Sequence, residues 1–137
     1  MNGPNRPSLV SLAAKWYERS LCDLRGARLF FDQTNPEDYE NSCYHCQQAA
    51  EKALKGCLTL YDIPFLKKHD LDYLCQLCIG QEPSFATIHA ECKELTVYSN
   101  APRYPEYPEI DRPEAESALA KTEKIIVFCS KFLSTNK

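Results

Sequence analysis

The chain of 137 residues has little glycine, no long hydrophobic run and no excess of positive charge. With four glycines and no repeat or low-complexity tract, collagen-like and disordered classes are excluded. A signal peptide needs an apolar stretch of about 7–15 residues and a membrane span about 20, and neither occurs, so we expect a cytoplasmic protein and no membrane partner. Sixteen Lys and Arg against nineteen Asp and Glu give a net charge of −3. This balance excludes a histone-like protein, predicts no DNA binding and restricts any phosphate site to a local basic patch.

The length of the chain is sufficient for one domain, since domains usually have about 100–150 residues. We predict a disordered N-terminus over residues 1–7 and a single helical domain over residues 8–134. Apolar residues recur at helical spacing in five segments, and no alternating strand pattern is found. The helices are predicted over residues 8–33, 37–61, 70–79, 84–98 and 113–133. The sequence therefore predicts an all-α protein, an up-and-down four-helix bundle with one additional short helix.

Eight cysteines include two Cys-x-x-Cys pairs, Cys43 with Cys46 and Cys75 with Cys78. Such pairs are typical of zinc sites, which leaves a metal centre and redox chemistry as alternatives. On the predicted helices, however, each pair shares a face with apolar residues, as cysteines that fill a core do. We favour core packing and expect no metal site and no cofactor. Structural disulfides are not expected in the reducing cytoplasm.

The opposite face of the helix over residues 37–61 is polar. It carries His45, Gln48, Lys52, Lys55 and Thr59 at roughly helical spacing. Such a face is either simply solvated or able to bind phosphate oxygens through its lysines. Spacing alone does not decide between the two.

Three segments carry a resemblance to a known family. Residues 47–56, Gln-Gln-Ala-Ala-Glu-Lys-Ala-Leu-Lys-Gly, resemble the QQAAEKALKA segment of the HEPN domain family. His69, followed by Leu71, is similar to its H-x-L-x-x-L marker, and Tyr98 followed by Arg-Tyr-Pro at residues 103–105 is similar to its Y…RYP marker. The markers occur in the family's order, and the resemblance extends from about residue 8 to residue 133.

The resemblance implies a compact helical bundle, often a homodimer, in a family associated with nucleotide binding and RNA metabolism. Many members are encoded beside a minimal nucleotidyltransferase, and some of these pairs act as toxin and antitoxin. Catalytic members cut RNA without metal through an Arg-x4-6-His motif near the start of the last helix. Here no histidine lies within that spacing after Arg103 or Arg112. We therefore do not extend the ribonuclease activity to this chain.

The resemblance and the residues together give the candidate nucleotide or phosphate site. Its members are Gln48, Lys52, Lys55, His69, Arg103 and Tyr104. The lysines and Arg103 would supply positive charge, His69 a polar contact and Tyr104 a face for stacking. Alternatively, His69 only orients the helix that follows it, and Arg103 only ties its loop to Glu106 or Glu109.

The function predicted from these observations is that of a non-catalytic HEPN-type domain that binds a nucleotide, RNA or a protein partner. It would act with a separate minimal nucleotidyltransferase, as in a toxin–antitoxin or RNA-related system. One alternative is a metal-independent ribonuclease that uses a rearranged pair of Arg103 and His69. The other is a purely structural bundle whose apolar face forms a dimer or binds a partner.

Overall fold

The computed structural model describes residues 8–33, 35–100, 105–106 and 108–134, and within these ranges the regular elements are all helical. They are α1 (Leu9–Phe31), α2 (Pro36–Leu60), α3 (Leu71–Gln81), α4 (His89–Leu95) and α5 (Arg112–Leu133). Two short 3₁₀ helices, η1 (Pro83–Ile88) and η2 (Thr96–Tyr98), flank α4. The all-α prediction is confirmed, whereas the predicted disorder of residues 1–7 concerns a segment outside the described residues.

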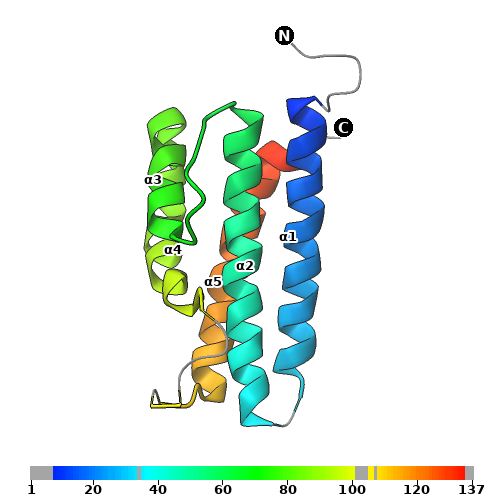
Figure 1. Ribbon diagram of the computed structural model, residues 1–137, viewed down its shortest axis with the longest axis vertical. Helices are drawn as coiled ribbons and strands as arrows, with labels where there is room; N and C mark the ends of the chain where they lie inside the picture. The colour runs from blue at the N-terminus through cyan, green and yellow to red at the C-terminus, as the bar shows by residue number, and fades with distance from the viewer. Residues whose placement is uncertain (1–7, 34, 101–104, 107, 135–137) are drawn as a thin grey trace.

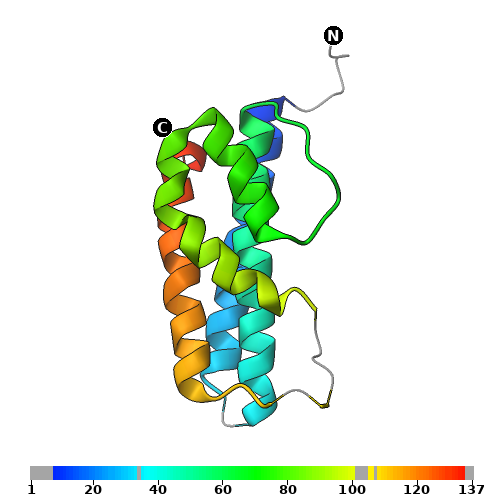
Figure 2. The same cartoon turned by 90° about the vertical axis from the view of Figure 1, so that its left-hand side faces the viewer.

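The three long helices α1, α2 and α5 run along the long axis of the molecule (Figure 1). α3 packs against α2 and α4, and α4 packs against α2 and α5 (Figures 1 and 2). α1, α2, α4 and α5 alternate in direction, and the shorter α3 runs roughly parallel to α2 after a long connection (Figure 2). This arrangement is the predicted up-and-down bundle with one additional helix.

The helix ends follow the capping residues in the sequence. The Ser8 side chain accepts a hydrogen bond from the backbone N–H of Ser11 at the start of α1. Asp111 caps α5 in the same way, with Pro113 in the first turn. α2 ends where Asp62 adopts a left-handed backbone conformation with φ of 58°. This turn directs the chain into the connection that carries His69.

The helix predicted over residues 84–98 is not one α-helix. The segment begins as the 3₁₀ helix η1, forms two turns of α-helix in α4 and ends as η2. Phe85 and Ile88 are both buried, and because residues three apart lie above one another in a 3₁₀ helix, η1 directs both side chains into the core. The β-branched pairs Thr87–Ile88 and Thr96–Val97 further disfavour a continuous α-helix.

The core is formed by side chains from all five α-helices. Seven of the eight cysteines are buried in it and Cys22 is exposed, in agreement with the prediction that these residues pack in the core. Burial raises the pKa of the Cys46 thiol to about 12, so it stays protonated at neutral pH. Within the described ranges, no three His, Cys, Asp or Glu side chains come together as a metal site. None of the described helices combines the length and the apolar character needed to cross a membrane.

Candidate functional site

A polar cluster centred on His69 lies where the connection between α2 and α3 folds back onto α2. Nδ1 of His69 lies 3.0 and 3.1 Å from the two carboxylate oxygens of Glu51. Lys55 donates to Glu51 at 2.8 Å and Gln47 donates to it at 3.1 Å. We call these residues, together with Thr96, the His69 cluster.

Thr96 joins the cluster from η2. Its hydroxyl donates to the backbone carbonyl of His69 at 3.3 Å and accepts from the backbone N–H of Leu71 at 3.0 Å. The Gln47 side chain also approaches the His69 carbonyl, at 3.5 Å. Segments that are distant in the sequence therefore meet at His69: the middle of α2, the connection before α3, and η2.

The carboxylate of Glu51 is the electrostatic centre of this cluster. Glu51 is only 3% exposed. Burial acts to raise its pKa, but the hydrogen bonds from Lys55, His69 and Gln47 outweigh burial, and the pKa lies below its ordinary value. Glu51 therefore carries a negative charge at neutral pH that compensates Lys55. The His69 side chain is 67% exposed and is held through Nδ1, which leaves Nε2 without a partner among the described residues.

Lys52 belongs to a second cluster, between α1 and α2. Asp23 on α1 accepts from Lys52 and also contacts Nδ1 of His45 at 3.0 Å. The His45 ring stacks on Phe30 with a centroid distance of 5.4 Å. Gln48 donates to the side-chain oxygen of Gln47 and so is linked to the His69 cluster indirectly. The polar face predicted for α2 is thus divided between two sets of partners.

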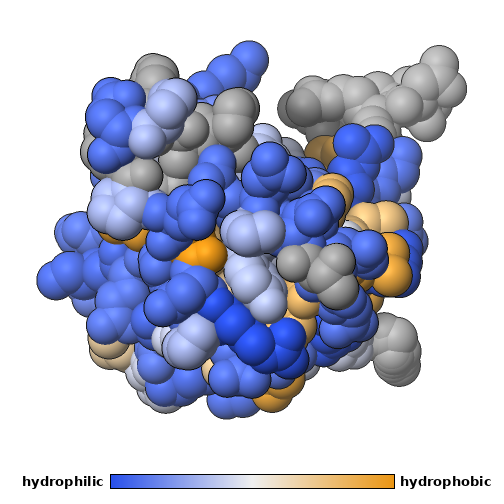
Figure 3. Space-filling model, turned by 90° about the horizontal axis from the view of Figure 1, so that it is seen from below, coloured by the Kyte–Doolittle hydropathy of each residue, from blue (hydrophilic) through white to orange (hydrophobic). Residues whose placement is uncertain are grey.

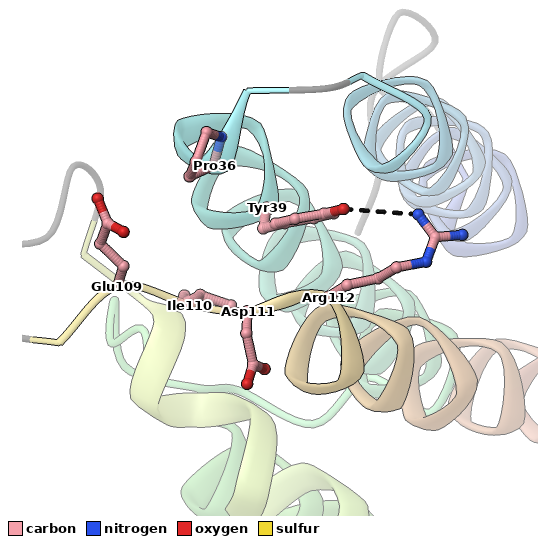
Figure 4. A pocket seen from close by; sticks show the side chains of 6 residues that line it. All are labelled: Pro36, Tyr39, Glu109, Ile110, Asp111 and Arg112. Carbon is pink, nitrogen blue, oxygen red and sulfur yellow. Dashed lines mark hydrogen bonds between the residues drawn. The ribbon is translucent and has the colours of Figure 1, made fainter.

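Arg103 and Tyr104 lie outside the described residues. The segment that follows them, from Glu109 to Arg112, forms a pocket together with the start of α2. It has a volume of about 330 Å³ and is lined by Pro36, Tyr39, Glu109, Ile110, Asp111 and Arg112 (Figure 4). The guanidinium of Arg112 points to the hydroxyl of Tyr39 and donates to it at 3.5 Å (Figure 4). It also lies 4.5 Å from the centre of the Phe31 ring. The hydrogen bond to Tyr39 raises the pKa of Arg112, which makes no ion pair with any described carboxylate.

The electrostatic setting of this pocket is mixed. Glu109 and Asp111 lie on its rim and oppose the charge of Arg112. Seen from this end of the bundle, the described surface is mostly hydrophilic, with small separate apolar patches (Figure 3). The pocket therefore offers an aromatic hydroxyl and one cation rather than a strongly positive surface.

Glu51, Asp23 and Thr96 were not predicted from the sequence as site residues. A signal for Glu51 was present, because it precedes Lys55 by four residues on the same helix face. Nothing in the local sequence shows that Glu51 is buried or that His69 folds back onto it. The contacts of Asp23 and Thr96 likewise join residues far apart in the chain.

The fold and these clusters define a helical-bundle domain with polar clusters between its elements. The chain belongs to the HEPN domain family, because the family model matches residues 13–132. In structure it is similar to TT1696 from Thermus thermophilus, with 28% sequence identity and a TM-score of 0.70. This similarity covers 87% of the present chain and 96% of the Thermus chain. No curated protein matches the chain significantly.

Proposed function

We propose that this HEPN domain binds a nucleotide or a nucleotide-bearing partner next to the His69 cluster, without catalysis, and acts with a separate nucleotidyltransferase chain. The observation that supports this best is that the cluster brings together residues from two of the family's three sequence markers. Glu51 belongs to the first marker and His69 to the second. Thr96, which contacts the His69 carbonyl, comes two residues before Tyr98, where the third marker begins.

His69 is the ligand contact that the geometry favours. Its Nδ1 is engaged by a buried carboxylate, which fixes the plane of the ring and directs Nε2 outward. Nε2 is therefore available to hydrogen-bond a base edge, a ribose hydroxyl or a phosphate oxygen. Arg103 and Tyr104, seven and eight residues after Thr96, would add a cation and a stacking face.

Lys52 and Lys55 have a smaller part in this proposal. Each is already paired with a carboxylate, Lys52 with Asp23 and Lys55 with the buried Glu51. A phosphate would have to compete with these carboxylates for the ammonium groups. We therefore assign the main positive contact to Arg103 and expect Lys52 and Lys55 to contribute less.

A binding titration with ATP, GTP and short single-stranded RNAs tests the proposal. We expect saturable binding to one of these, weakened at least tenfold in Arg103→Ala and in His69→Ala. Arg25→Ala, which removes an exposed arginine of α1, is the matched control and should bind like the wild type. Absence of saturable binding, or an unchanged affinity in Arg103→Ala, would overturn the nucleotide proposal.

The partner is tested separately. A minimal nucleotidyltransferase encoded next to this chain should copurify with it when the two are expressed together. Copurification without any nucleotide affinity would instead support the purely structural interaction bundle. Failure of the two chains to associate would contradict the paired-system proposal.

One observation favours a second candidate function. A histidine held by a buried carboxylate, with its other nitrogen outward, is the arrangement of a general base. In metal-independent RNA cleavage, Nε2 of His69 would accept the proton of the attacking 2′-hydroxyl, and Arg103 would stabilise charge on the phosphate. The P–O5′ bond would break as the 2′,3′-cyclic phosphate forms, and the leaving 5′-oxygen would take a proton from water. RNA that stays intact at high protein concentration excludes this function. Cleavage that is lost in His69→Ala supports it.

A further inference from the structure

A pocket on α1 is lined by none of the residues described above, although Lys55 of the His69 cluster lies beside it. It has a volume of about 220 Å³ and is lined by Leu12, Lys15, Trp16 and Arg19. Trp16 is the only tryptophan in the chain. It is partly exposed, and its indole N–H has no hydrogen-bond partner among the described residues.

The close packing of α1 on α2 fixes the position of Trp16. A Cβ atom on Gly56 would lie only 3.1 Å from the Cβ of Trp16, so the absence of a side chain at Gly56 permits this approach. On the α2 side, the ammonium group of Lys55 lies 5.7 Å from the centre of the indole ring. The ring is therefore held in place and is a preformed wall of the pocket.

The charges around the pocket are not compensated. Lys15 and Arg19 are four residues apart on one side of α1, and neither makes an ion pair with a described carboxylate. Glu18 lies between them in sequence but pairs with neither. Lys55, by contrast, is neutralised by Glu51. The chain as a whole carries a net charge of −3, so this is a local excess of positive charge beside an aromatic pocket.

We propose that this pocket is a docking site for an acidic segment of another protein. One apolar side chain of that segment fills the pocket against Trp16 and Leu12, and carboxylates on either side of it pair with Lys15 and Arg19. Charge complementarity identifies the partner as acidic, and the apolar lining requires an anchor side chain.

A nucleic acid fits this surface less well. Leu9, one helical turn before Leu12 on the same side of α1, is 38% exposed. It continues the surface as apolar area, which an acidic peptide can cover with a further apolar residue and a phosphate backbone cannot. Only two cations line the described pocket, whereas binding of nucleic acid depends on several phosphate contacts.

The experiment uses Trp16 itself as the probe, because it is the single tryptophan of the chain and its fluorescence can be excited at a wavelength where the eight tyrosines do not absorb. The full chain is titrated with a synthetic peptide that carries one central leucine between two pairs of glutamates. We expect a saturable blue shift of the emission. Two matched peptides, one with lysines in place of the glutamates and one with serine in place of the leucine, should bind at least tenfold more weakly.

Variants of the protein test the charges. The double variant Lys15→Glu with Arg19→Glu should bind the acidic peptide at least tenfold more weakly than the wild type and should bind the lysine peptide more tightly. This tighter binding shows that the variant is folded and that the pocket is intact. Lys93→Glu reverses an exposed lysine of α4 that makes no ion pair with a described carboxylate and should leave binding unchanged.

Three outcomes would overturn the docking proposal. They are no fluorescence change with the acidic peptide, an affinity that the double reversal does not alter, and a shift with single-stranded RNA but not with the peptide. The result is independent of the proposed nucleotide site. Arg103→Ala, which tests that site, should leave peptide binding intact.

Discussion

At the scale of single residues, Glu51 is the centre of the His69 cluster. Its carboxylate is almost fully buried and is hydrogen-bonded to the side chains of Lys55, Gln47 and His69. A buried carboxylate that accepts this many hydrogen bonds is stable only as the anion. Protonation would leave the buried donors around it without an acceptor, which costs free energy. Glu51 therefore stabilises the fold and orients His69 at the same time.

Glu51→Gln tests the stabilising role of this charge. Because the folded pKa of Glu51 lies below its unfolded value, its stabilisation is fully present above the unfolded pKa. It is lost as the pH falls through the folded pKa. At pH 7 we expect the variant to have a free energy of unfolding lower by about 1–3 kcal/mol.

Denaturant titrations between pH 7 and pH 3 measure the effect. The difference in the free energy of unfolding between the wild type and Glu51→Gln should decrease as the pH falls below about 4.3, the ordinary pKa of a glutamate. Glu18→Gln, at an exposed position without an ion pair to any described residue, should show no such difference. A difference that stays constant over this range would show that the charge of Glu51 is not what stabilises the fold.

The cysteines give a second prediction at this scale. Cys22 is exposed and lies 3.2 Å from Nη2 of Arg25, whereas the seven other thiols are buried. Since the thiolate is the reactive form and burial keeps a thiol protonated, we expect one fast-reacting thiol per chain with Ellman's reagent. Eight should react in denaturant. More than one fast-reacting thiol in the native protein would contradict the burial of the other seven.

At the scale of elements, helices with strong signals at both ends were predicted well. α1, α2 and α5 begin within one residue of the predicted starts, because Ser8, Pro36 and Pro113 act locally. The segment at residues 84–98 was predicted less well. Its 3₁₀ start depends on where Phe85 and Ile88 meet the core, which is a property of the packed bundle and not of the segment.

Two glycines in helices provide a matched test of packing. At Gly56 an added Cβ would lie 3.1 Å from Trp16 and 3.2 Å from Leu133, whereas at Gly80 nothing lies within 4 Å. Alanine is a better helix former than glycine by about 1 kcal/mol. We therefore expect Gly80→Ala to raise the free energy of unfolding by about 0.5 kcal/mol. Gly56→Ala should lower it by about 1 kcal/mol, because overpacking between α1 and α2 outweighs propensity.

Thermal or denaturant unfolding of both variants measures these changes. The emission of Trp16 should also shift in Gly56→Ala, because the added methyl group displaces the Trp16 side chain. It should stay unchanged in Gly80→Ala. Equal stabilisation by the two substitutions would contradict the close approach of α1 to α2.

At the scale of the whole molecule, the partners of the candidate site residues depend on the tertiary arrangement of the helices. Lys52 and Lys55 share one predicted face, but Lys52 pairs with Asp23 on α1 and Lys55 with Glu51 under the connection before α3. Helical spacing places both lysines on the surface of α2. It does not show which element packs on either side of them. The partners of such residues follow only from the tertiary arrangement.

The single-domain organisation predicted for residues 8–134 also belongs to this scale and is open to a direct test. Side chains from all five α-helices meet in one core, and Leu74 of α3 packs in it with no exposed surface. A continuous core predicts that α3 and α4 unfold together with the long helices. Denaturant transitions followed by Trp16 fluorescence, which reports on α1 and α2, and by far-ultraviolet circular dichroism, which reports on every helix, should therefore coincide.

Leu74→Ala sharpens this test. The substitution should cost about 2–5 kcal/mol through the cavity it leaves in the core. In one cooperative domain, both transitions move to lower denaturant by the same amount, although Trp16 lies on a different helix from the substitution. If the circular dichroism transition moves and the fluorescence transition does not, then α3 and α4 unfold as a separate unit. The prediction of a single domain would then be wrong.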